Sequence, residues 1–268
     1  YQKTGVNHVD GKDRPASVLS ETAVRYAQVF NKRWAFKINA GYLKATDWVS
    51  DTKTDQNPNN LSTANPLYPE LSAGNNPAYD GWNKYGDENN NAVTVSGITY
   101  NGNPNRSFIV RRTGYWEKDL ANPVVENKKF DVALYHKFGA KTELSYTYRF
   151  GEMDGVFQRG NKIQLNNATV QNHKLELKGA NYLVRSYISI ENTGNSYNIK
   201  PLADNLDLTN LSNNAWRDKF KAALQTQLNN GADISTAATI ARQAADQGRV
   251  EPGTAAFEQL KNTISGIN

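Results

Sequence analysis

The chain has no cysteine, one methionine and three histidines in 268 residues. Without cysteine it has no disulfide framework, no thiolate nucleophile and no cysteine-bound metal. His8, His136 and His173 are too far apart in sequence to predict a metal triad, and no His-Glu-x-x-His motif occurs. A Gly-x-Ser-x-Gly motif and a phosphate-binding glycine loop are also missing. We therefore expect no enzyme activity, no metal and no cofactor.

Long hydrophobic runs are absent as well. The mean hydropathy is −0.71, and no segment approaches the roughly 18 consecutive apolar residues of a membrane helix. A membrane β-strand is not excluded, because its apolar residues alternate with polar ones. The net charge is +5, but the basic residues stand singly between aromatic ones instead of clustering as nucleic-acid binding requires. We therefore expect no nucleic-acid partner.

The chain does contain segments in which apolar and polar residues alternate. The stretch "RYAQVFNKRWAFKINAGYLKATDW" (25–48) holds two alternating segments joined by a polar three-residue connection. In the second segment Trp34, Phe36 and Ile38 share one face of a strand, and Lys37 lies on the other face. The pattern recurs twice, which predicts three hairpins with strands at 22–30 and 34–43, 130–138 and 142–150, and 169–177 and 182–191.

The connections are of two kinds. Those within hairpins have three or four residues, whereas those between hairpins are long. Short turns at one end of a sheet and long links at the other are typical of outer-membrane β-barrels, with the long loops extracellular. An Arg or Lys that faces lipid at mid-depth costs about 2–4 kcal/mol. We therefore expect Arg25, Lys37, Arg149 and Arg185 to face the lumen, and Tyr26, Phe36, Tyr148 and Ile188 to face lipid.

The long links differ in composition. Residues 51–106 are rich in Asn, Gly and Pro, which favour turns. The tail after residue 192 instead shows helical spacing, with Ser212 to Asn214 as candidate caps and stops at Gly231 and Gly248. We interpret the tail as short helices on an extracellular loop. The alternative is a separate small helical domain.

Aromatic residues on these links are the candidate binding residues. The Asn-rich link carries Trp82, Tyr85, Tyr115 and Trp116, and the first tail helix carries Trp216 and Phe220. Such side chains stack on a substrate or pack against a partner protein. Alternatively, they hold a loop against the barrel rim, or the apolar stripes of the tail pack only on each other.

Two stretches resemble a known family. "ETAVRYAQVFNKRWAFKINAGYLKATDW" and, more closely, "YTYRFGEMDGVFQRGNKIQLNNATVQNHKLELKGANYLVRSYISIENTGNSYNIKPLADNLD" are similar to the SusC/RagA family of TonB-linked outer-membrane transporters of Bacteroidetes. Together they cover about a third of the chain. The resemblance implies that the chain is a portion of a 22-stranded antiparallel transmembrane barrel in the outer membrane.

The same resemblance implies a domain organisation and a set of partners. Residues 1–20 would connect an N-terminal plug to the barrel, residues 21–191 would form strands with extracellular loops at 44–129 and 151–168, and residues 192–268 would form a further extracellular loop. The implied function is active uptake of oligosaccharides or oligopeptides. The implied partners are a SusD-like surface lipoprotein, the TonB-ExbB-ExbD complex, outer-membrane lipid and the rest of the same barrel.

Two other functions fit the same residues. A passive porin-like barrel would have similar strands but no energy coupling. A surface β adhesin or binding module would present the aromatic loops on a sheet with one wet face and one core face. A plug domain upstream of this chain would distinguish an active importer from a passive porin, and partitioning with detergent would distinguish a barrel portion from a soluble adhesin.

Overall fold

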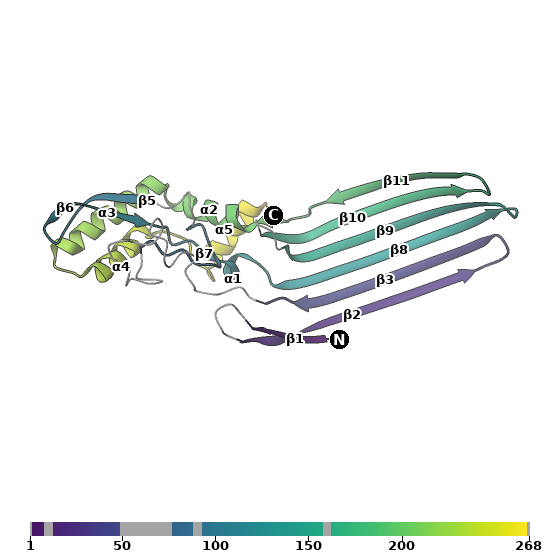
Figure 1. Ribbon diagram of the computed structural model, residues 1–268, viewed down its shortest axis with the longest axis horizontal. Coiled ribbons are helices and arrows are strands. Elements are labelled where there is room, and N and C mark those ends of the chain that lie inside the picture. The colour runs from purple at the N-terminus through teal and green to yellow at the C-terminus, as the bar shows by residue number, and fades with distance from the viewer. Residues whose placement is uncertain (1, 8–12, 49–76, 88–92, 158–161, 267–268) are drawn as a thin grey trace. The chain divides into compact units, whose positions relative to one another are not determined.

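The structure is a computed structural model that describes residues 2–7, 13–48, 77–87, 93–157 and 162–266 (Figure 1). The chain divides into two compact units. Unit 1 is a β-sheet built from residues 2–7, 13–48, 122–157 and 162–197. Unit 2 combines residues 77–87 and 93–121 with residues 198–266. Each unit is described by itself below.

Unit 1 is an antiparallel sheet whose strands lie side by side in one layer (Figure 1). The order β1-β2-β3-β8-β9-β10-β11 follows the chain, and β12 pairs with β10. The strand bounds are β1 Gln2–Asn7, β2 Asp13–Val29, β3 Trp34–Thr46, β8 Val124–Phe138, β9 Thr142–Phe157, β10 Ile163–Lys178, β11 Leu183–Asn192 and β12 Tyr197–Asn198.

All three expected hairpins are present, and their tight turns lie at one end of the sheet. In the first turn the Asn31 side-chain oxygen accepts hydrogen bonds from the backbone N–H groups of Arg33 and Trp34, at 2.8 and 3.0 Å. In the second, Gly139 adopts a φ of 72°, which glycine reaches at no steric cost. In the third, the Gly179 N–H donates to the Tyr182 carbonyl at 2.8 Å. The prediction of an antiparallel sheet is confirmed.

The expected segment boundaries are wrong in several places, because the strands are longer than their alternating parts. Residues 1–20 are not only a connection, since β1 and the first part of β2 pair with each other there. The expected loop 151–168 is wrong at both ends, because β9 and β10 pair there, from Gly151 with Val170 to Phe157 with Ile163. The expected loop 44–129 likewise loses both ends to strand pairs between Lys44–Thr46 and Val124–Glu126.

Unit 2 is a mixed helical and β unit with a core of its own (Figure 1). Its elements are β4 Lys84–Tyr85, β5 Val93–Tyr100, β6 Asn103–Val110, β7 Tyr115–Trp116, α1 Glu117–Leu120, α2 Ile199–Asn210, α3 Asn213–Asn229, α4 Ile234–Ala245 and α5 Ala255–Ser265. The β5–β6 hairpin packs against α3, which in turn packs against α4.

Side-chain N-caps define where the tail helices begin. Asn198, Ser212, Asp233 and Thr254 each accept a backbone hydrogen bond at the N-terminus of α2, α3, α4 and α5. The expected start of the first tail helix at Ser212 is therefore confirmed, although α2 precedes it and was not expected. The alternative of a separate small helical domain is wrong, because the tail helices share one core with the β5–β6 hairpin of the Asn-rich link.

That shared core explains why the tail does not stand alone. Trp216, Phe220 and Leu224 recur every four residues on α3, so that they form one stripe. The stripe packs on Ile98 and Phe108 of the β5–β6 hairpin, and all of these side chains are buried. A further five buried residues of α4 complete the cluster, namely Ile234, Ala237, Ala238, Ala241 and Ala245.

Candidate functional site

The sheet of unit 1 has two chemically different faces, and the strand register aligns them across the whole sheet. Tyr26 lies opposite Ile38, which lies opposite Val132. The same row continues through Tyr148 and His173 to Ile188 on β11. The residue sets that the sequence assigns to opposite faces are therefore separated across all six strands. We call the two sides the apolar face and the polar face.

The apolar face is exposed. Large side chains on it include Tyr26, Leu134, Tyr146, Leu175 and Ile188, each between 41% and 61% exposed. Among the described residues of unit 1, Ala133 is the sole buried hydrophobic residue. The sheet thus has no hydrophobic core of its own, and an apolar surface of this extent marks a region that another apolar phase covers.

The apolar face ends abruptly along the strands. On β3 it runs from Trp34 to Tyr42, and two residues later Lys44 follows on the same face. Lys44 forms an ion pair with Glu126 at 2.7 Å, and Lys128 forms one with Glu152 at 2.6 Å. The face is therefore a band of about nine residues bounded by charges at the end opposite the tight turns.

At the tight turns the band ends in clustered aromatic rings. The Trp34 and His136 ring centroids are 4.1 Å apart, and those of His136 and Phe138 are 4.4 Å apart. Phe30 stacks on Phe36 with centroids 5.0 Å apart. Aromatic rings at both ends of an apolar band are typical of strands that cross a bilayer.

The polar groups inside the band have partners on the same face. The Tyr26 hydroxyl donates to Gln28 at 2.7 Å, and the Tyr148 hydroxyl donates to the Gln171 side-chain oxygen at 3.2 Å. The Tyr146 hydroxyl lies 2.7 Å from His173 Nδ1. Such pairing lowers the cost of placing a polar atom in an apolar phase, which is high when the atom has no partner.

The polar face carries eight basic and five acidic side chains. Asp131 accepts a hydrogen bond from Asn39 and lies 3.6 Å from Arg149 Nε. Glu176 pairs with Arg185 at 2.7 Å. The basic residues of this face are Arg25, Lys37, Lys129, Lys137, Arg149, Lys174, Lys178 and Arg185, and the acidic ones are Glu21, Asp131, Glu143, Glu176 and Glu191.

Three of the six aromatic residues expected to bind a substrate or partner lie in the core of unit 2. Trp216 and Phe220 are fully buried on α3, and Tyr115 is buried on β7. They cannot stack on a ligand, because side chains from both segments of unit 2 cover them. The expectation that the tail presents apolar stripes to a partner is wrong for this reason.

The other three expected residues lie nearer the surface. Trp82 is 53% exposed, on a turn between the buried Asp80 and β4. Trp116 is half-buried, with the Lys84 ammonium 5.6 Å from its ring centre. Tyr85 is half-buried and donates from its hydroxyl to Glu117 at 3.0 Å. Trp82 is thus the one expected binding residue of unit 2 that offers a largely open ring.

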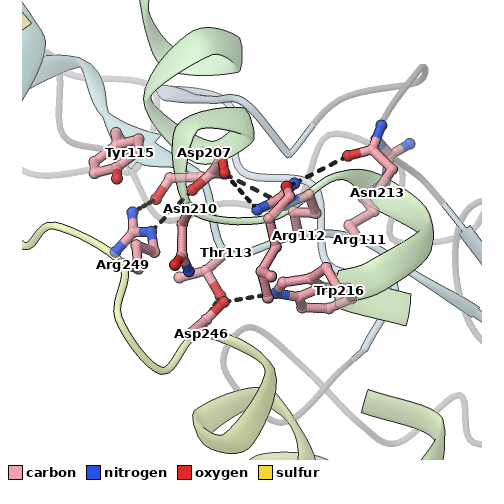
Figure 2. A network of polar contacts seen from close by, with 12 residues as sticks. Arg111, Arg112, Thr113, Tyr115, Asp207, Asn210, Asn213, Trp216, Asp246 and Arg249 are labelled. Atoms are coloured by element: carbon pink, nitrogen blue, oxygen red, sulfur yellow. Dashed lines mark hydrogen bonds and ion pairs between the residues drawn. The ribbon is translucent and has the colours of Figure 1, made fainter. Parts of the chain in front are cut away.

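Unit 2 contains a buried network of charged residues that the sequence did not predict. Figure 2 shows it around Asp207 of α2, whose carboxylate binds Arg249 at 3.0 Å and lies 3.9 Å from Arg112 Nε. Arg112 also donates to the Asp207 carbonyl at 2.8 Å and to the Leu211 carbonyl at 2.7 Å. Arg249 stacks over Tyr115, 3.8 Å from its ring centre.

The network joins the two segments of unit 2. Asp246 accepts hydrogen bonds from Trp216 Nε1, at 2.8 Å, and from Thr113 (Figure 2). Arg242 donates to the Arg111 carbonyl at 2.8 Å and to the Pro77 carbonyl at 3.2 Å. Because residues 77–115 and 207–249 are far apart in sequence, these bonds cross-link the Asn-rich link to the helical tail. Their geometry indicates a structural role.

One carboxylate near this network lacks a hydrogen-bond partner. Within the described ranges, no other residue donates a hydrogen bond to either oxygen of the buried Asp87. Burial raises the pKa of Asp87 to about 7, and the nearby Lys84 only partly offsets this effect. Burial also lowers the pKa of Lys84 to about 8. Among the residues that the structure describes, no group of three or more His, Cys, Asp or Glu side chains could hold a metal ion.

The unpaired Asp87 predicts a pH dependence of unit 2. In the unfolded chain Asp87 ionises near pH 4 but in the fold near 7, so that stability falls as the pH rises between these values. We expect Asp87→Asn to stabilise unit 2 at pH 8 by on the order of 1–3 kcal/mol and to have little effect at pH 4. Urea unfolding followed by helical circular dichroism measures this, because all helices of the described residues belong to unit 2. Asp218→Asn, at an exposed site on α3, is the control, and an equal gain at both pH values would contradict the prediction.

Comparison with known proteins leaves the site without a relative. No family model matches the chain, and neither a curated protein nor a solved structure does. No helix within the described ranges is both long and apolar enough to cross a membrane.

Proposed function

We propose that unit 1 is a membrane-spanning portion of an outer-membrane β-barrel that imports nutrients. The observation that carries the proposal is the exposed apolar band, which has aromatic rings at the tight turns and ion pairs at the other end. A membrane strand needs about 9–11 tilted residues, and the band from Trp34 to Tyr42 has that length. The opposite face is charged, as the wall of a water-filled lumen is.

The finer parts of this proposal come from the resemblance to the SusC/RagA family. They are a 22-stranded barrel closed by further strands, energy from the TonB-ExbB-ExbD complex and a SusD-like lipoprotein at the cell surface. Both segments of unit 2 leave the sheet at the end opposite the tight turns, which is the extracellular end in such barrels. In this arrangement unit 2 is a folded extracellular module, and Trp82 is its candidate contact for substrate or lipoprotein.

The two alternative functions differ from the importer in observable ways. A surface adhesin would need a second layer to cover the apolar face, whereas an apolar face bounded by ion pairs needs only lipid. A passive porin would conduct ions steadily across a planar bilayer. An importer with a plug in its lumen would hold that conductance closed, so that the native full-length protein distinguishes the two.

The membrane assignment is tested with single cysteines, which the chain's lack of native cysteine makes simple. Ile188 and Ser189 are exposed neighbours on opposite faces of β11. In lipid vesicles we expect Ile188→Cys to react about tenfold more slowly than Ser189→Cys with a charged maleimide, because the charged reagent does not enter hydrocarbon. A fluorophore at position 188 should also be quenched by brominated lipid.

The matched pair provides the internal control, since the two sites differ by one residue and share the same strand. Equal labelling at the two positions, together with no quenching by brominated lipid at either, would show that the apolar face does not meet lipid. Quenching at Ser189→Cys and not at Ile188→Cys would reverse the assignment of the faces.

A further inference from the structure

The chain contains two Asn-Gly pairs, Asn101-Gly102 and Asn230-Gly231, and both belong to unit 2. Asn-Gly is a dipeptide prone to spontaneous deamidation, because glycine has no side chain to shield its own amide nitrogen. In that reaction the backbone nitrogen of the glycine attacks the side-chain carbonyl carbon of the asparagine. The attack requires the backbone between the two residues to rotate. The hydrogen bonds around each pair therefore determine whether it reacts in the folded protein.

The Asn230-Gly231 pair is locked at the C-terminus of α3. The Gly231 N–H donates to the Leu228 carbonyl at 3.1 Å, and the Ala232 N–H donates to the Gln227 carbonyl at 3.1 Å. These two bonds form a Schellman motif, with Gly231 in the left-handed conformation at a φ of 83°. The nitrogen that would attack is thus engaged in a hydrogen bond. The reaction at Asn230 requires the last turn of α3 to open first.

The Asn101-Gly102 pair is the exposed turn of the β5–β6 hairpin. Both residues are exposed, with left-handed φ values of 52° and 74°. Among the residues that the structure describes, none forms a hydrogen bond with the Gly102 N–H or with the Asn101 side chain. A Cβ added at Gly102 would meet nothing within 4 Å, so no described segment lies against this glycine. The attacking nitrogen is therefore free and open to solvent.

We propose that Asn101 is a site of spontaneous deamidation and that the fold protects Asn230. The Gly102 nitrogen gives up its proton and bonds to Asn101 Cγ, and the side-chain amino group takes up a proton and leaves as ammonia. The resulting succinimide ring adds one water molecule at either carbonyl and opens to aspartate or to isoaspartate. Water is the one co-reactant. The proposal concerns unit 2 alone and holds whether or not unit 1 spans a membrane.

Deamidation changes the turn in two ways. Both products replace a neutral amide with a carboxylate, and isoaspartate also adds one methylene group to the backbone. The length of a two-residue turn sets the register of its strands, here the pairing of Tyr100 with Asn103. The same hairpin contributes Ile98 and Phe108 to the core of unit 2. We therefore expect the modified unit 2 to unfold at a lower urea concentration.

Peptide mapping of the native full-length protein tests the site. Trypsin releases Asn101 in the peptide 85–106 and Asn230 in the peptide 222–242, so mass spectrometry follows both residues in one sample. During incubation at mildly alkaline pH we expect Asn101 to deamidate at least about tenfold faster than Asn230, because Asn230 must first lose its cap hydrogen bonds. Incubation in urea is the internal control, since unfolding removes the cap and should bring the two rates together.

Two outcomes of this mapping would overturn the proposal. One is that Asn230 deamidates as fast as Asn101, or faster, in the native protein. The other is that Asn101 stays intact in the native protein over a period in which it reacts completely in urea.

A turn-compatible variant tests the effect on the fold. Asn101→Gly keeps the left-handed conformation at no steric cost and removes the amide that reacts. After incubation we expect the unaltered protein to show a lower urea midpoint by helical circular dichroism, whereas Asn101→Gly should keep its midpoint. Equal losses in both proteins, or no loss in either, would overturn the effect assigned to the modified turn.

Discussion

Replacing Asp207 with alanine is expected to lower the free energy of unfolding of unit 2 by about 3–5 kcal/mol. The carboxylate lies between two buried guanidinium groups, 3.0 Å from Arg249 Nε and 3.9 Å from Arg112 Nε. All three side chains are at most 4% exposed. Removing this charge leaves the Arg112 guanidinium buried without a carboxylate and leaves Arg249 with Glu251 as its remaining carboxylate, and this loss of a partner is what makes such a change costly.

A matched control for this variant lies one turn earlier on the same helix. Asp204 pairs with Lys200 at 3.0 Å, but the two side chains are 27% and 31% exposed. An exposed pair contributes less than about 1 kcal/mol, so Asp204→Ala should change the stability little. Urea unfolding followed by helical circular dichroism measures both variants, because all helices of the described residues belong to unit 2. Similar losses for Asp204→Ala and Asp207→Ala would show that the buried network does not hold unit 2 together.

The hairpins of unit 1 could be predicted from the sequence because each strand has one apolar face and one polar face. In the stretch from Trp34 to Tyr42, large apolar residues recur at every second position, and the register then places the same residues on one face. A pattern with period two fixes the sidedness without any knowledge of partners. The separation of Tyr26 and Ile188 from Arg25 and Arg185 was predictable for this reason.

The ends of the strands could not be predicted in the same way. Beyond the apolar band the strands continue through "ENKK" (126–129) and "GEMD" (151–154), where alternation stops but backbone pairing does not. Ion pairs such as Lys128–Glu152 replace apolar contacts there. The alternation of apolar and polar residues extends only as far as the apolar band. It therefore predicts the length of the band and not the full length of the strand.

In unit 2 one hairpin signal in the sequence was missed, and one long-range contact could not be predicted from the sequence. The Asn101-Gly102 turn, with φ values of 52° and 74°, connects β5, which is rich in β-branched residues, to β6, and such an Asn-Gly pair is a strong hairpin signal. In contrast, the contact of Trp216 with Phe108 joins residues more than a hundred positions apart. No local pattern reports such a contact, and the aromatic stripe of α3 therefore looked free to bind a partner.

The charged network was beyond prediction for a related reason. Arg112, Asp207 and Arg249 belong to residue types that are almost never fully buried unless they are paired. In the sequence they are scattered among other charges, and only the fold shows that they are neighbours. The two faces of the sheet could thus be predicted from the alternation of apolar and polar residues. The interactions that hold unit 2 together could not be predicted in this way.

The second substitution with a large expected loss of stability is at Gly114, which follows the buried arginines of the network. Its φ is 62°, and an added Cβ would lie 2.5 Å from the Tyr85 carbonyl oxygen and 3.0 Å from the Asp87 amide nitrogen. Both contacts are with backbone of the neighbouring segment, which cannot rotate away as a flexible side chain could. A left-handed conformation costs a non-glycine residue about 1–2 kcal/mol, and overpacking adds about 1–3 kcal/mol or more.

We therefore expect Gly114→Ala to destabilise unit 2 by about 3–5 kcal/mol, because conformation and crowding act together. Gly102→Ala is the matched control: Gly102 has a similar φ of 74°, but an added Cβ meets nothing within 4 Å. It should lose only the conformational part, about 1–2 kcal/mol. Urea unfolding measures the difference, and hydrogen exchange should show α3 deprotected while β9 of unit 1 keeps its protection. If the two alanine variants lose the same stability, the close approach of the Tyr85 backbone to Gly114 does not constrain the fold.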